Sequence, residues 1–176
     1  MHVHAPRILA VALLASGCGL ATGASKNTTF AVSATVVGNC IIDLATTMAF
    51  DDYVQGAGDV NQTSTIAVRC TSGTSYGIGL SVGTGGGNFA QRTMSRATAT
   101  STSRLEYNLY TAALPSNIWR DAGARRETQN TQGGTGTGLA NVINHTVYGR
   151  LQDSATSRAA APGNDYTSTI TVTLNY

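Results

Sequence analysis

The chain has 176 residues, of which 41% are hydrophobic and 11% are charged, and its formal net charge at pH 7 is +2. This nearly balanced charge excludes the strongly basic surface that nucleic-acid binding needs. The 20 glycines, together with abundant Ser, Thr and Asn, are typical of many short strands joined by turns. The composition therefore predicts an all-β protein.

Residues 1–24 have the features of a secretory signal peptide. Arg7 precedes the apolar run ILAVALLA and small residues follow, so cleavage is expected after Ala24 or, alternatively, after Ala21. The apolar run is too short to span a membrane as a helix. An alternative is a lipoprotein signal in which Cys18 is acylated. Either leader would direct the protein out of the cytoplasm and leave about 150 residues, enough for one domain with a hydrophobic core.

The segment 25–38 follows the leader and carries a strand pattern. Apolar side chains alternate with small or polar ones, as in a strand with one buried face. The apolar positions are Phe30, Val32, Ala34 and Val36. Two interpretations are open, because this strand could be the first of the chain's own sandwich or could be inserted into a neighbouring molecule.

Cys40 and Cys70 are the only cysteines after the leader. In an oxidising compartment two such cysteines are expected to form a disulfide, and the alternative is a pair of free buried thiols. On the chain-entropy model, closing a loop of about 30 residues stabilises a domain by roughly 3 to 4 kcal/mol.

Further strand patterns recur between residues 40 and 151. The predicted strands lie within 40–50, 63–70, 75–82, 104–112 and 139–151. Turns or loops are predicted at 51–62, 88–103 and 120–138, and the second of these is alternatively a weak edge strand. Trp119 is expected in the core or as a plug over a sheet. The pattern predicts an antiparallel sandwich or barrel of about seven or eight short strands, without an amphipathic helix.

The last predicted strand, within 166–176, carries an apolar stripe. Its members are Ile170, Val172, Leu174 and Tyr176. A sandwich of the immunoglobulin type that ends on this strand is one strand short. The missing strand would leave a groove with unpaired backbone groups, which another strand could fill by β-augmentation.

Ionisable side chains offer little for catalysis. His145 is the only histidine after the leader and is expected to face solvent or to cap a sheet edge. Asp51 and Asp52 are adjacent, so in a strand they would point to opposite faces. Two cysteines without a second His or Cys pair do not form a closed zinc site, and the glycine-rich stretches GTGGGN and GGTGTG lack the P-loop Lys-Ser/Thr. The sequence therefore predicts no enzyme activity, no metal site and no cofactor.

Three separated stretches, YNLYTAALPSNIWRDAG, TVYGRL and YTSTITVTLNY, together with Cys40 and Cys70, resemble the spore coat protein U domain family. Pilins of the archaic chaperone-usher class belong to this family. The family commonly has Gly where this chain has Arg120, and Asp where it has Ser168. The resemblance implies a pilus subunit with an incomplete immunoglobulin-like β-sandwich that is completed by donor-strand exchange.

The same resemblance implies roles for individual segments. Residues 25–38 would be the donor segment and residues 39–176 the sandwich domain. The side chains that would enter the groove of the next subunit are Phe30, Val32, Ala34 and Val36. Those that would border the chain's own groove and pair with a chaperone before assembly are Ile170, Val172, Leu174 and Tyr176.

The implied partners are identical or homologous subunits, a periplasmic chaperone and an outer-membrane usher. No nucleic acid and no stable membrane insertion are implied. The protein would occupy the periplasm during assembly and then an extracellular pilus that supports adhesion and biofilm formation. The alternative is a secreted or lipid-anchored glycan-binding module that uses Trp119, Tyr107 or the loop around Arg125.

Overall fold

The structure is a computed structural model that describes residues 23–96, 102–113, 117–121 and 131–176. Nearly all of the predicted signal peptide, Cys18, Arg125 and Arg126 lie outside these residues. The chain divides into two units, Met1–Thr35 and Val36–Tyr176. None of the helices in the described ranges has the length and apolar character needed to cross a membrane.

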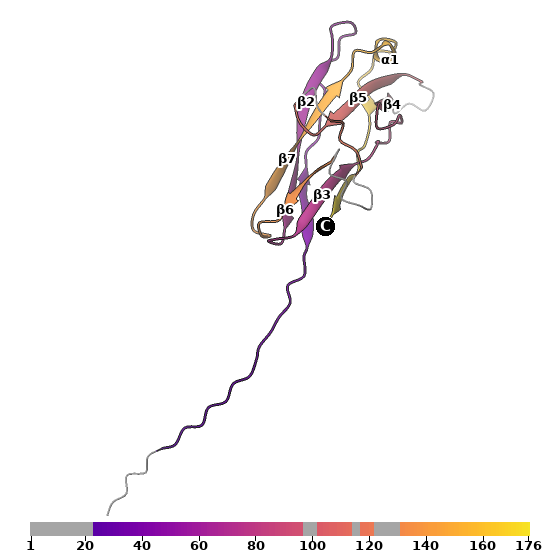
Figure 1. The fold of residues 1–176 in the computed structure, drawn as a ribbon. Coiled ribbons are helices and arrows are strands. Elements are labelled where there is room, and N and C mark those ends of the chain that lie inside the picture. Colours follow the sequence, from indigo (N-terminus) through magenta and orange to yellow (C-terminus); the bar gives the residue numbers. More distant parts are fainter. Residues whose placement is uncertain (1–22, 97–101, 114–116, 122–130) are drawn as a thin grey trace, which may run out of the picture. The chain divides into compact units, whose positions relative to one another are not determined.

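The larger sheet of the second unit has six strands in the order β1-β2-β7-β5-β4-β8, and every neighbouring pair is antiparallel (Figure 1). Its strands are β1 (Cys40–Ala45), β2 (Val60–Cys70), β4 (Arg92–Arg96), β5 (Arg104–Tyr110), β7 (Ile143–Leu151) and β8 (Tyr166–Thr167). The longest pairing joins β2 to β7 near the centre of the sheet. Strand β1 is at one edge and pairs with β2 alone.

The smaller sheet has three antiparallel strands in the order β6-β3-β9. They are β3 (Ser75–Leu80), β6 (Gln132–Thr135) and β9 (Val172–Asn175). One helical turn, α1 (Ala155–Arg158), begins after Ser154, whose side chain caps it by accepting the Ser157 N–H. The all-β antiparallel sandwich predicted from the sequence is therefore confirmed.

The hydrophobic core lies between the two sheets. It joins residues of β2, β5 and β7 to alternate residues of β3, and its largest member, Trp119, is fully buried. The Trp119 indole N–H donates to the Ile78 carbonyl at 2.8 Å, so the buried ring has its one polar group satisfied. The core position predicted for Trp119 is confirmed.

Arg92 of β4 is fully buried, which is unusual for a charged side chain. Its guanidinium donates to the carbonyls of Leu80, Ser81 and Trp119 and to Asn108 Oδ1 at 2.7–3.2 Å. Burial lowers its pKa to about 10. Four acceptors replace the water that the cation loses, and they tie β4 to the end of β3 and to Trp119.

Three predictions made from local pattern are wrong. Strand β4 lies within 88–103, where a loop or weak edge strand was expected, and it is flanked by β5 and β8. The glycine-rich stretch 132–135 is strand β6, because β3 supplies the partner that the sequence pattern does not reveal. Strand β2 begins at Val60, inside the predicted turn 51–62.

The described part of the first unit, residues 23–35, forms neither helix nor strand. Its side chains are exposed, including Phe30 and Val32 at 87% and 85%. Neighbouring Val36 and Val37, at the start of the second unit, are 81% and 78% exposed and lie in no strand. The described residues of this segment therefore form no strand in the structure.

Candidate docking groove

A groove of about 470 Å³ opens along the sandwich between the two sheets. One wall is the stretch 45–48, which continues beyond β1, and the other is the stretch 167–172, which joins β8 to β9. Buried side chains form its floor: Ile66, Leu80, Tyr107, Leu109 and Val147, with half-buried Met94 beside them. An extended apolar floor between two walls fits an extended segment with apolar side chains on one face.

The wall formed by residues 169–171 is bonded on only one side. Ser81 N–H donates to the Thr171 carbonyl at 3.0 Å and Thr84 N–H donates to the Thr169 carbonyl at 3.1 Å. Ile170 lies between them, and within the described part of the chain its N–H and C=O form no hydrogen bond. Since β9 is an edge strand, this wall offers backbone groups to a further strand.

Strand β1, which precedes the opposite wall, is also incompletely covered. Ile42 of β1 pairs with Val68 of β2, so both side chains lie on the core face of the sheet. Val68 is fully buried, whereas Ile42 is 41% exposed. The core is therefore closed over β2 and open over β1.

The stretch after β1 is held close to the sheet at Gly149. A Cβ atom at this position would overlap Met48 Sδ and come within 3.0 Å of Phe50 Cζ. Phe50 in turn packs against the Tyr107 ring, with centroids 6.1 Å apart. The absence of a side chain on β7 thus allows Met48 and Phe50 to enter the core beside the groove.

One buried hydroxyl in the groove, that of Tyr107, lacks a hydrogen bond of standard geometry among the described residues. Burial raises the pKa of Tyr107, so the ring faces the groove as a neutral phenol.

The predicted site residues fall into two groups. The predicted donor side chains, Phe30, Val32, Ala34 and Val36, are all exposed. The predicted groove-edge residues Ile170, Val172 and Leu174 are half-buried against the core, and the first two line the groove. Tyr176 is exposed, and its hydroxyl lies 3.4 Å from Asn39 Oδ1. Whether any of these residues takes part in donor-strand exchange stays a prediction.

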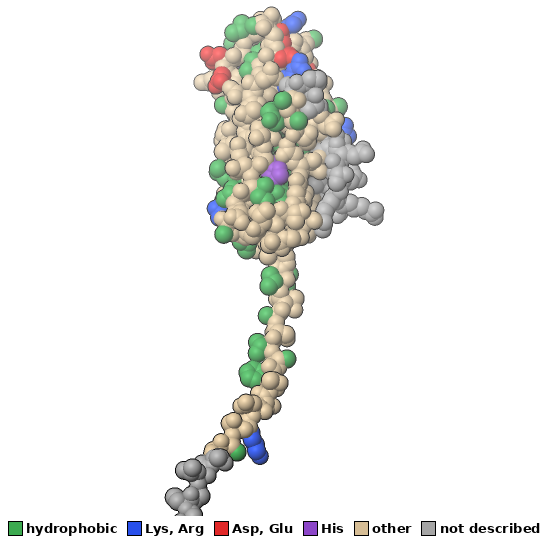
Figure 2. All heavy atoms as spheres, turned by 60° about the vertical axis from the view of Figure 1, so that its left-hand side comes forward, with side chains coloured by type: hydrophobic (Ala, Val, Ile, Leu, Met, Phe, Trp, Pro, Cys, Tyr) green, Lys and Arg blue, Asp and Glu red, His purple; other side chains and the backbone are tan. Residues whose placement is uncertain are grey.

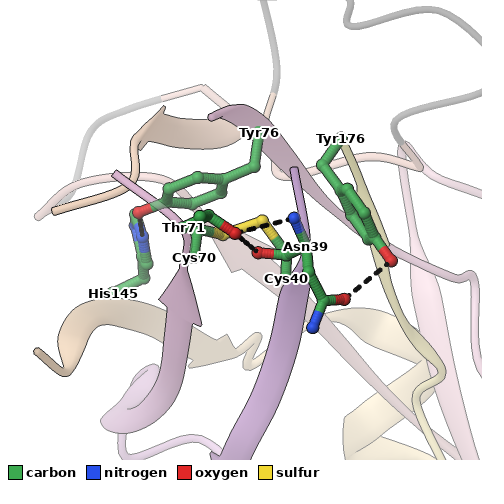
Figure 3. Close-up of a disulfide and its surroundings, with 7 residues drawn as sticks. All are labelled: Asn39, Cys40, Cys70, Thr71, Tyr76, His145 and Tyr176. Carbon is green, nitrogen blue, oxygen red and sulfur yellow. Dashed lines mark hydrogen bonds between the residues drawn. A yellow bond between two sulfur atoms is a disulfide. The ribbon is translucent and has the colours of Figure 1, made fainter. Parts of the chain in front are cut away.

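A disulfide joins Cys40 to Cys70 at one end of the sandwich (Figure 3). The disulfide predicted from the sequence is present in the structure.

The buried His145 lies near this disulfide and corrects the expectation that it faces solvent (Figure 3). Its Nε2 is 2.9 Å from Tyr76 Oη and its Nδ1 is 2.9 Å from Gln132 Oε1. Because Gln132 Nε2 donates to two backbone carbonyls, Gln132 Oε1 must accept the Nδ1 proton, which leaves Nε2 to accept from Tyr76. Burial lowers the pKa of His145. The neutral ring therefore joins β7 to both β3 and β6.

Charged side chains gather at the opposite end, around α1 (Figure 2). There, Asp153 accepts hydrogen bonds from Arg158, Tyr53, Gly56 N–H and Gly58 N–H. These bonds, that of Arg158 first, hold the pKa of Asp153 far below its usual range. The network fixes the turn between β1 and β2 onto the start of α1. The described ranges contain no group of three or more His, Cys, Asp or Glu that could hold a metal ion.

The residues suggested for glycan binding are poorly placed for it. Trp119 and Tyr107 are buried in the core and cannot offer a ring face to a sugar. Sequence reasoning did not identify 45–50 as a groove wall. A strand was predicted over 40–50, whereas β1 ends at Ala45 and the residues that follow it border the groove.

The spore coat protein U domain model matches residues 26–173. Among solved structures, a chain of the CsuC–CsuE complex, a chaperone–tip adhesion subunit pre-assembly complex from archaic chaperone-usher Csu pili of Acinetobacter baumannii, is similar, with a TM-score of 0.50 and 19% identity. The match covers 81% of this chain and 40% of that one, so this chain spans well under half of the matched length. A comparison with curated proteins finds no match.

Proposed function

The chain belongs to the spore coat protein U domain family, and from this premise we propose that it is a structural subunit of an archaic chaperone-usher pilus. In this proposal residues 25–38 are a donor segment and residues 39–176 are the sandwich that accepts the donor of a neighbour. Residues 1–24 are the signal peptide. The sandwich is a structural unit of the fibre and takes no part in catalysis.

The observation that carries the proposal is the pairing of two incomplete features in one chain. The groove has an apolar floor and an unbonded edge at Ile170. The segment 28–36 has alternating apolar side chains and lies in no strand. A strand that added to the β9 edge would bond its backbone along one wall and direct every second side chain to the floor.

The burial of the donor side chains is large enough to drive assembly. Phe30, Val32 and Val36 are at least 81% exposed. Transfer of each from water to the groove is worth roughly 1.5 to 3 kcal/mol, or about 5 to 9 kcal/mol in all, before backbone hydrogen bonds are added. Ala34, as the smallest of the four, adds less. Because donor and groove complete one core, slow unfolding would keep such a fibre intact.

The same groove needs cover before assembly. An exposed edge at β9 and an open core are aggregation hazards. We propose that a periplasmic chaperone pairs with residues 170–176 until an outer-membrane usher exchanges it for the next donor. The similar structure, which is named as a chaperone–subunit pre-assembly complex, supports this proposal. The assembled fibre would stand outside the cell and support adhesion and biofilm formation.

Deletion of residues 25–37 tests the donor role. The shortened chain keeps the groove but has no donor, so it should accept a strand and not pass one on. Alone with its chaperone it should give no polymer, and mixed with the intact chain it should shorten the ladders seen on gels without boiling. Boiling-sensitive ladders formed by the shortened chain alone would overturn the proposal.

A further inference from the structure

The junction between the donor segment and the sandwich, at residues 36–40, is held by stronger links than β1, the strand that follows it. Five of the six residues of β1 are exposed, and the strand pairs with β2 alone. If the proposed function is right, tension along a fibre enters each sandwich through residues 36–40, at the first residue of β1. An edge strand pulled from its end would separate from its neighbour one hydrogen bond at a time.

Two cross-links oppose this separation at the point where the pull would enter. Cys40, the first residue of β1, is bonded to Cys70, the last residue of β2 (Figure 3). Just before it, Asn39 N–H donates to Thr71 Oγ1 at 2.8 Å, and Thr71 donates to the Asn39 carbonyl from its N–H and its hydroxyl, each at 2.9 Å. This Asn39–Thr71 clamp binds both backbone groups of Asn39.

The residue before the clamp is also confined. A Cβ atom at Gly38 would lie 3.0 Å from Thr74 Oγ1, so the chain passes close to the turn between β2 and β3. On the other side, the Tyr176 hydroxyl lies near the Asn39 side chain (Figure 3). The exit of the donor segment is thus fixed to β2 and its following turn before β1 begins.

We propose that the Cys40–Cys70 disulfide and the Asn39–Thr71 clamp form a tension anchor, which passes load from the donor segment directly into β2. The load therefore enters at Cys70, the last residue of β2, and continues along the chain that follows it. Residues 41–69 lie between the bridged cysteines, so tension bypasses them. The weakly packed β1 and the adjoining groove wall at 45–50 then keep their shape while the fibre is stretched.

Single-molecule stretching of the full chain after the leader tests the anchor without a fibre. One handle is attached at Lys26, the only lysine, and the other at Ala113, an exposed residue after β5. Stretching is compared before and after reduction, and the same comparison is made on assembled fibres. Reduction should lower the force of the first opening event and add about 100 Å of released length per unfolded sandwich, from 29 freed residues at ~3.5 Å each.

Thr71→Val separates the clamp from the disulfide. The variant keeps the covalent link and should lower the force of the first opening event without adding length. Thr63→Val, at an exposed position of β2, is the matched control and should leave that force unchanged. Reduction with no change in the first opening force, or equal forces in both valine variants, would overturn the anchor.

The two proposals fail in different ways. A chain that responds to reduction as expected but forms no polymer contradicts the pilus function. Fibres that assemble normally and open at the same force before and after reduction contradict the anchor and leave the pilus function in place.

Discussion

Two segments of the chain carry the same pattern of alternating apolar side chains but differ in whether they form a strand. They are residues 30–36 and residues 170–176. In the first, Phe30 and Val32 are exposed and no strand forms. In the second, Val172 and Leu174 lie in β9 and pack against the core. The difference is the partner, because β9 has β3 beside it, with Leu80 opposite Val172. An alternating pattern shows that a segment can be a strand, and the neighbouring strand decides whether it is one.

Within the described part of the chain, the second segment, residues 170–176, has backbone hydrogen-bonding partners on one side only. Its β3 side is bonded, through Thr169 and Thr171, and its other side is open at Ile170. The segment that lacks a partner and the edge that lacks a partner are complementary.

Val32→Asp should abolish polymer formation. The substitution would place a carboxylate on the apolar floor of the acceptor groove, where no described cation lines the wall to pair with it. Ladders on gels without boiling measure the outcome. Ser33→Asp puts the same charge on the alternate face and should assemble. If both variants fail equally, the groove does not distinguish the two faces of the segment.

Arg92→Met should destabilise the sandwich by about 2 to 4 kcal/mol, because the carbonyls of Leu80 and Trp119 and the Asn108 side chain lose a buried donor. These bonds hold the end of β3, beside which residues 169–172 lie. Urea unfolding measures the change. Arg120→Met, at an exposed neighbour of Trp119, should shift stability by at most about 0.5 kcal/mol. Equal losses of unfolding free energy in the two variants would show that the hydrogen bonds of Arg92 do not stabilise the sandwich.

A peptide of residues 26–37 should stabilise the chain that lacks residues 25–37. At about 100 times its Kd it should add about 2.7 kcal/mol and raise Tm by roughly 5 to 15 °C. The same peptide with Val32→Asp should leave Tm unchanged. Stabilisation by both peptides would mean that the segment does not bind through its apolar face.

Acidification from pH 7 to pH 5 should weaken the sandwich slightly through His145. Burial lowers the pKa of His145 in the folded chain, so the unfolded chain binds the proton more readily. The neutral ring's contribution is complete above the unfolded pKa of about 6.5 and declines as pH falls below it. Urea midpoints across this range measure the slope. His145→Gln should flatten it, and an unchanged slope would assign the effect to other groups.

The periodicity of the sequence predicted most of the strands because apolar side chains alternate along them. Ile66, Val68 and Cys70 share a buried face, and Tyr76, Ile78 and Leu80 are buried in β3, as expected. The failures occur where a neighbour overrides the local pattern. Gln132–Thr135 is glycine-rich and becomes a strand because β3 lies beside it, and polar Arg92 is buried because four acceptors converge on it.

The candidate groove also has features that the sequence predicted and features that it did not. The sequence identified the apolar stripe at 170–176 and the alternating segment at 30–36, since both depend on spacing alone. It did not identify the groove wall at 45–48 or the burial of the Tyr107 hydroxyl in the groove. Those features arise where segments distant in sequence come into contact, and such contacts cannot be predicted from a local sequence pattern.

By itself the sequence predicted an all-β chain with one disulfide and two apolar stripes, because composition and alternation are properties of consecutive residues. Only the tertiary structure decided which stripe has a partner, where the groove opens and where the disulfide acts. Each of these depends on which strand lies beside which. The order β6-β3-β9 places β9 at an edge of its sheet, and Cys40–Cys70 fixes β1 to β2 just after the segment 25–38.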